Sequence, residues 1–169
     1  VKESRERVRA AINQCGLDFP KRRITVNLAP ADLPKFGGRF DLPIALGILA
    51  ASGQLPGTGL ANCEFLGELA LDGSLRPVPG AIQAAGAASS SGRQLVVPAD
   101  SAPLAALAPH SRVVPASDLL TLCAHLNGSC RIDHCAAQRI DREDAYPDLG
   151  DIVGQQGAQG RGGVNLEDA

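Results

Sequence analysis

Hydrophobic residues recur along this chain with a spacing that changes from segment to segment. In residues 3–15 they follow one face of a helix, and Gly16 is placed to end it. Residues 23–28, RITVNL, are rich in β-branched side chains and predict a strand. Residues 41–51 are apolar on nearly every face, which predicts a buried helix, and Asp41 is its expected N-cap.

The second half of the chain alternates short apolar segments with turn signals. Asp72-Gly73 predicts a hairpin between strands at residues 64–71 and 74–78. The pattern then predicts helices at residues 79–90, 102–107 and 118–126, and strands at residues 94–97 and 112–114. Ser117 or Asp118 is the expected N-cap of the last helix. Such alternation of strands and helices is typical of the α/β class, here an α+β sandwich with a mixed sheet.

The apolar periodicity fades from about residue 129. We therefore predict one domain over residues 1–128, a linker over residues 129–147 and a separate, Gly-rich and disordered segment over residues 148–169. The chain lacks an initiator Met and opens inside a helical pattern, which indicates a piece of a longer protein.

Composition narrows these expectations. The 169 residues are 44% hydrophobic but only 3% aromatic, with no Trp or Met, so the core must be built from aliphatic side chains. No stretch of about 18 apolar residues is present, so no membrane span is predicted. Five cysteines at irregular spacing do not indicate a disulfide framework, which favours a cytoplasmic location.

Charge is unevenly distributed along the chain. Residues 1–40 carry a net charge of +5, and the remaining residues carry −7. A basic N-terminal part suggests an anionic partner such as DNA, whereas a solvated charged surface is the alternative for any single residue. The candidate contacts to a nucleic acid are Lys21, Arg22, Arg23, Lys35 and Arg39.

Two groups of side chains suggest further chemistry. Cysteine and histidine are zinc ligands, but Cys123, His125, Cys130, His134 and Cys135 match none of the standard zinc spacings, so we predict no metal site. The Gly-rich loop at residues 35–39 leads into a helix and has two interpretations, an anion site or a tight turn that aims the helix. The complete phosphate-binding motif G-x-x-x-x-G-K-[ST] is absent from the sequence.

A resemblance to a known family rests on residues 22–52. RITVNLAPADLPK followed by GGRFDLPIALGILAASG resembles the signature of the ComM/YifB family, also called magnesium-chelatase-like proteins. SRERVRAAINQCGLDFP and FLGELALDGSLRPVPGA fit the same family, so the resemblance covers residues 1–127. It implies a fold similar to the Lon proteolytic domain and to the second domain of ribosomal protein S-five. The strands that usually precede the first helix are expected to be missing here, which would leave a sheet edge unpaired.

Lon-type domains cut peptides with a Ser-Lys dyad, and the resemblance implies where that dyad would fall. Arg39 stands at the position of the serine and Ile82 at that of the lysine, and their separation of 43 positions agrees with the Lon spacing. A guanidinium stays protonated and an isoleucine accepts no proton, so we expect no catalytic residues in this chain. Arg39 is then expected to pair with Asp41 or Asp32, or to contact an anion.

Residues 146–155 resemble the start of the family's AAA+ ATPase module. The resemblance implies a hexameric parent protein that uses ATP and Mg²⁺, with no cofactor in this fragment, which would contact its own AAA+ module and other copies. The leading hypothesis is a non-catalytic domain that serves assembly or DNA contact in branch migration during natural transformation. The alternatives are an active Ser-Lys-type hydrolase on the same fold and a metal-chelatase-like subunit.

Overall fold

The computed structural model describes residues 2–29 and 37–136, which lie in one compact unit spanning residues 1–138. Its helices are α1 (Lys2–Gln14), α2 (Asp41–Ala51), α3 (Ala81–Ser90), α4 (Ala102–Ala105) and α5 (Leu119–Leu126), with 3-10 turns at Gly57–Gly59 and Ala99–Ser101. Its strands are β1 (Cys63–Phe65), β2 (Glu68–Leu69), β3 (Leu75–Arg76), β4 (Gln94–Pro98) and β5 (Val113–Ala116). The predicted combination of strands and helices in the α/β class is confirmed.

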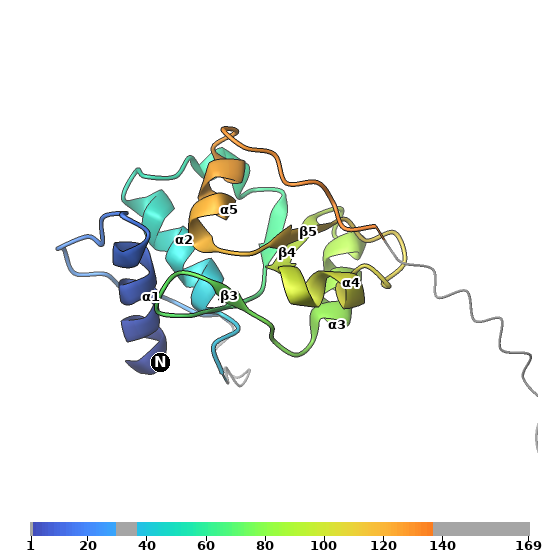
Figure 1. The fold of residues 1–169 in the computed structure, drawn as a ribbon, viewed down its shortest axis with the longest axis horizontal. Coiled ribbons are helices and arrows are strands. Elements are labelled where there is room, and N and C mark those ends of the chain that lie inside the picture. The colour runs from blue at the N-terminus through green and yellow to red at the C-terminus, as the bar shows by residue number, and fades with distance from the viewer. Residues whose placement is uncertain (1, 30–36, 137–169) are drawn as a thin grey trace, which may run out of the picture. The chain divides into compact units, whose positions relative to one another are not determined.

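A parallel sheet with the strand order β1-β4-β5 lies between two groups of helices. Figure 1 shows α1, α2 and α5 on one side of this sheet and α3 and α4 on the other. The strands β2 and β3 form a separate antiparallel pair. In the described residues, the predicted mixed sheet is therefore two sheets, one parallel and one antiparallel. The hairpin also pairs with the segment before α5, through a bridge between Ser74 and Asp118 and a hydrogen bond from the N–H of Leu75 to the carbonyl oxygen of Ser117.

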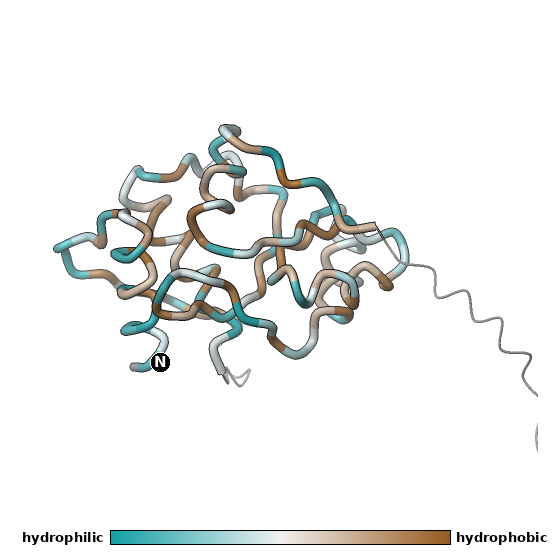
Figure 2. The backbone as a smooth tube through the Cα atoms, in the orientation of Figure 1, coloured by the Kyte–Doolittle hydropathy of each residue, from teal (hydrophilic) through white to brown (hydrophobic). Residues whose placement is uncertain are grey.

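Alternate side chains of the central strands supply two hydrophobic cores, one on each face of the sheet. Val96 and Val114 belong to the core that contains α1, α2 and α5. Leu95, Val97 and Val113 belong to the core of α3 and α4. This is the period of two that places neighbouring strand residues on opposite faces. In Figure 2 the hydrophobic residues gather where these elements pack together, and hydrophilic residues lie at the outer turns.

The hairpin and the helix caps follow the local sequence signals. Gly73 adopts a φ of 89° in the predicted Asp72-Gly73 turn, a conformation that favours glycine. The Asp72 carboxylate accepts hydrogen bonds from the hydroxyl and the backbone N–H of Ser74, which lowers the pKa of Asp72. Of the two predicted caps, Asp118 caps α5 by accepting a hydrogen bond of 2.7 Å from the N–H of Thr121.

The predicted strand at residues 23–28 is wrong. No backbone–backbone hydrogen bond joins residues 20–29 to another part of the chain that the structure describes. A strand is defined by pairing with a neighbour, so β-branched residues without a neighbour form an extended segment only. The predicted strand at residues 64–71 is interrupted, because Gly67 separates β1 from β2 and packs closely against Leu42 and Pro98.

The compact unit continues beyond residue 128. The N–H of Cys135 donates to the carbonyl oxygen of Val113 in β5, and the N–H of Ile132 donates to the Nδ1 atom of His125. Most of the predicted linker and all of the segment 148–169 lie outside the described residues. Among the described helices, none is long and apolar enough to cross a membrane.

Leu122 tests the core on the α5 side of the sheet. Its side chain is fully buried, so Leu122→Ala is expected to lower the free energy of unfolding by about 2–5 kcal/mol, measured by urea denaturation. Leu120 lies on the same helix with 52% exposure, and Leu120→Ala should change stability by no more than about 0.5 kcal/mol. Equal effects of the two substitutions would contradict the assigned orientation of α5.

Candidate functional site at the start of α2

A buried ion pair joins α1 to the first turn of α2. The Asp41 side chain is 0% exposed, and the Nε of Arg7 lies 2.7 Å from its Oδ2. The Arg7 Nη2 lies 3.3 Å from Asp41 Oδ1, so the guanidinium engages both carboxylate oxygens. The backbone N–H of Leu69 in β2 also donates to Asp41 Oδ2. One carboxylate therefore connects α1, α2 and the hairpin.

This ion pair replaces the N-cap that the sequence predicted. The structure places Phe40 at the N-cap position, without a side-chain hydrogen bond, and Asp41 at the first helical residue. A buried carboxylate is costly unless a cation and hydrogen bonds compensate it, and Arg7 supplies a two-point partner. The hydrogen bond to Asp41, opposed by burial, raises the pKa of Arg7 above its ordinary value, so Arg7 stays charged.

The Gly-rich loop is fixed by its backbone. The N–H of Gly67 donates to the carbonyl oxygen of Arg39, and the N–H of Leu42 donates to the carbonyl oxygen of Gly67. A Cβ atom on Gly38 would collide with the side chain of Glu68, so a larger residue there would require Glu68 to move. Within the described part of the loop, Gly38 is buried beside Glu68 of β2, whereas Gly37 is exposed.

The two positions at which the resemblance places the Lon dyad lie on different elements. Arg39 is half-buried in the loop before α2, and Ile82 lies on α3 with 36% exposure. The predicted pairing of Arg39 with Asp41 is wrong, because Arg7 occupies both carboxylate oxygens of Asp41. The other predicted partner, Asp32, lies outside the described residues.

The predicted nucleic-acid contacts divide into three groups. Lys21, Arg22 and Arg23 are consecutive and exposed, in the segment that follows α1. Arg39 belongs to the loop before α2, and Lys35 lies outside the described residues. Lys21, Arg22 and Arg23 are therefore close together only because they are consecutive in the sequence. Arg39 is a separate, half-buried cation on another segment.

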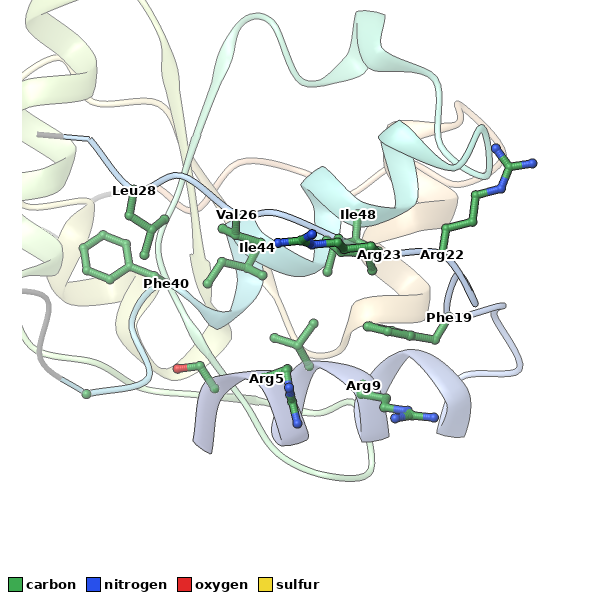
Figure 3. Close-up of a pocket in the computed structure, with 14 residues that line it drawn as sticks. Arg5, Arg9, Phe19, Arg22, Arg23, Val26, Leu28, Phe40, Ile44 and Ile48 are labelled. Atoms are coloured by element: carbon green, nitrogen blue, oxygen red, sulfur yellow. The ribbon is translucent and has the colours of Figure 1, made fainter. Parts of the chain in front are cut away.

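A cavity of about 600 Å³ lies between α1, the segment at residues 19–28 and α2. Figure 3 shows Phe19, Val26 and Ile44 turned into this space, with Arg5 and Arg9 along α1. The guanidinium of Arg9 lies 5.6 Å from the centre of the Phe19 ring, within the range of a cation–π contact. Sequence reasoning counted Arg5 and Arg9 only as charge, although their spacing of four residues predicts a shared helix face.

The cysteine and histidine cluster forms no metal centre in the part of the chain that the structure describes. Cys123 is buried on α5, His125 accepts the hydrogen bond from Ile132, and His134 lies 3.0 Å from the side-chain oxygen of Gln94. Burial raises the pKa of the Cys123 thiol to about 11, with smaller contributions from Cys15 and Asp118. Cys123 thus packs in the core, and His125 and His134 help to hold residues 129–135 to the domain.

A family model and several related proteins, compared with this sequence, all point to the same family. The sequence model of the family described as subunit ChlI of Mg-chelatase matches residues 1–101. YifB of Salmonella typhimurium is 46% identical over 98% of this chain, and YifB of Escherichia coli is 44% identical over the same share. The competence protein ComM of Haemophilus influenzae is 47% identical over 94% of this chain. The chain spans 32% of the length of each of these relatives.

The ion pair predicts a large effect when one partner is removed. Arg7→Met leaves the Asp41 carboxylate buried without a cation, so we expect a loss of about 3–5 kcal/mol in the free energy of unfolding. Adding Asp41→Leu to that variant should restore about half of the loss, because the buried charge is then gone. Arg93→Met breaks a half-exposed ion pair with Glu64 and should cost about 1 kcal/mol or less. Urea denaturation of the four proteins would contradict the assignment if Arg7→Met and Arg93→Met cost the same.

Cys123 predicts a pH dependence at alkaline pH. Its pKa is near 9.0 when solvated and about 11 in the folded protein, so the folded state disfavours the thiolate. This contribution to stability is complete below pH 9 and is lost as pH rises through about 11, because the unfolded thiol ionises first. Thermal midpoints of the wild type and Cys123→Ala should therefore converge between pH 9 and pH 11. A difference between the two midpoints that is constant over this range would contradict the raised pKa.

Proposed function

Because the chain belongs to the family of the ChlI subunit of Mg-chelatase, we propose that it is a non-catalytic domain of a larger AAA+ ATPase that acts on DNA. In this proposal the domain has the Lon-like fold without Lon chemistry. It contributes a DNA-contacting surface and contacts between copies in a hexamer. The parent protein uses ATP and Mg²⁺ to drive branch migration, in the cytoplasm. The observation that carries the proposal is the exposed basic segment at residues 21–23 beside α1.

The residues at the two dyad positions support the non-catalytic part of the proposal. Arg39 and Ile82 replace the two residues that a Ser-Lys hydrolase needs, and neither side chain can take a proton from a serine. The loop that would present the nucleophile is instead fastened to Gly67 through its backbone. A loop fixed in this way suits a rigid contact surface.

The charge distribution supports the DNA part. Lys21, Arg22 and Arg23 project from a segment outside any helix or strand, and Arg5 and Arg9 line the neighbouring face of α1. Such a cluster of cations displaces counterions from a phosphate backbone. The relative from Haemophilus influenzae is named a competence protein, which agrees with a role in natural transformation.

Salt-dependent DNA binding tests this surface. We expect the chain to bind branched and duplex DNA more tightly as salt is lowered, measured by fluorescence anisotropy. The double variant Arg22→Ala/Arg23→Ala should weaken binding to both DNAs alike. It should also reduce the slope of log affinity against log salt by about two, because two phosphate contacts are lost.

The matched control removes the same amount of charge elsewhere. Arg93→Ala/Arg131→Ala deletes two exposed arginines that pair with Glu64 and Asp133, and its salt slope should equal that of the wild type. If both double variants lose the same slope, binding follows net charge only and the assigned surface is wrong. If the wild type shows no binding at low salt, the DNA-contact role fails.

A metal-chelatase-like subunit is a second candidate, and the description of the matched family favours it. In that case the parent protein would couple ATP hydrolysis to a metal-inserting partner. The ATPase rate of the full-length protein separates the two candidates. Stimulation by branched DNA supports the DNA motor, and a rate that DNA leaves unchanged supports the chelatase-like role.

A further inference from the structure

The side-chain amide of Gln54 joins the loop after α2 to the segment that follows α1. Its Oε1 atom accepts a hydrogen bond of 2.8 Å from the backbone N–H of Asp18, and its Nε2 atom donates one of 2.7 Å to the carbonyl oxygen of Asp18. One amide therefore pairs with both backbone groups of a single residue, as a neighbouring strand would. We call these two hydrogen bonds the Gln54 clamp.

The end of α2 holds the clamp in place. Gly53 follows the helix with a φ of 78°, and the N–H of Gln54 donates to the carbonyl oxygen of Leu49 in the last turn. The Nε2 atom of Gln54 also donates a hydrogen bond of 2.8 Å to the hydroxyl of Ser52. The amide oxygen and both amide hydrogens are therefore engaged, which fixes the orientation of the side chain before any partner binds.

The residues between the clamp and the basic segment are also constrained. The Phe19 ring packs against the core that contains α1 and α2, beneath the guanidinium of Arg9. Pro20 has its φ fixed by its ring and restricts the conformation of the residue before it. Only these two residues separate Asp18 from Lys21. The position of Lys21 therefore follows from that of Asp18.

The basic segment at residues 21–23 is held at its two ends. Residues 20–29 make no backbone–backbone hydrogen bond with any other part of the described chain. Ile24 packs against the core directly after the segment, and Arg22 points away from the cavity in Figure 3. The clamp thus supplies the directional, hydrogen-bonded fastening on the side that leads into the segment.

We propose that Gln54 is a positioning residue for the DNA contact of the basic segment, an inference that rests on the proposed function. Gln54 itself touches no phosphate in this proposal. By holding the backbone of Asp18, it orders the three cations before DNA arrives, so less conformational entropy is lost when they engage the phosphates. The clamp therefore raises affinity without adding a charge.

Removing the amide separates positioning from charge. Gln54→Leu keeps the size of the side chain but removes the donors and the acceptor of the clamp. We expect its affinity for duplex and branched DNA to fall by about three- to tenfold at every salt concentration, measured by fluorescence anisotropy. The slope of log affinity against log salt should equal that of the wild type, because no phosphate contact is lost. Arg22→Ala/Arg23→Ala, in contrast, should reduce this slope.

A second half-buried glutamine provides the matched control. Gln94→Leu makes the same change at the start of β4, where the side chain bonds to Cys63 and His134. Its DNA affinity should equal that of the wild type. Hydrogen–deuterium exchange without DNA should become faster at the amides of residues 18–23 in Gln54→Leu and stay unchanged there in Gln94→Leu.

Ser52 tests whether the orientation of the amide matters. Ser52→Ala removes the hydroxyl that accepts from Gln54 and should weaken DNA binding less than Gln54→Leu does. Adding Ser52→Ala to Gln54→Leu should cause no further loss of affinity, because Ser52 acts through Gln54. Additive losses in the double variant would contradict this order.

Several results would overturn the role of Gln54. Wild-type DNA affinity in Gln54→Leu removes it, and a reduced salt slope would mean that charge had changed as well. Equal losses in Gln54→Leu and Gln94→Leu would reduce the effect to general destabilisation. A wild-type chain that binds no DNA at low salt would instead overturn the proposed function, and this inference with it.

Discussion

A fully buried carboxylate at the first turn of α2 has to be neutralised inside the protein, and Arg7 neutralises it. This requirement fixes α1 against α2 and brings the hairpin to the same point through the N–H of Leu69. Gly67, which precedes the hairpin, then makes one backbone hydrogen bond to Arg39 of the Gly-rich loop and one to Leu42 of α2. The orientation of α1, and with it one wall of the cavity, therefore depends on this ion pair together with the buried side chains of Val8, Ala11 and Ile12.

The elements that were predicted correctly from the sequence are determined by local interactions. The apolar spacing of α1, the Asp72-Gly73 turn and the Asp118 cap are all decided by residues within a few positions of one another. The failures are non-local. Residues 23–28 have strand-forming side chains but no partner in the described chain, and the pairing of Asp41 with Arg7 joins residues 34 positions apart. No local pattern distinguishes that partner from the nearer Arg39.

The candidate site was only partly visible in the sequence. Family resemblance pointed to the loop before α2 and to the two replaced dyad positions, but not to the way in which Gly38 and Gly67 fasten that loop. The cavity forms where α1, residues 19–28 and α2 meet. The hydrophobic periodicity within each segment does not reveal that the three segments lie together.

The two cores of the sheet differ in how far apart their residues lie along the chain. The core on the α3–α4 face is drawn from residues 81–113, which form a continuous stretch that includes the β4–α4–β5 crossover. The core on the other face joins Val8 near one end to Leu126 near the other. Short loops close more readily than long ones, so the α3–α4 face is expected to order first during folding. The side that carries the ion pair and the cavity then closes last, which makes it the part of the domain most exposed to wrong partners while the chain folds.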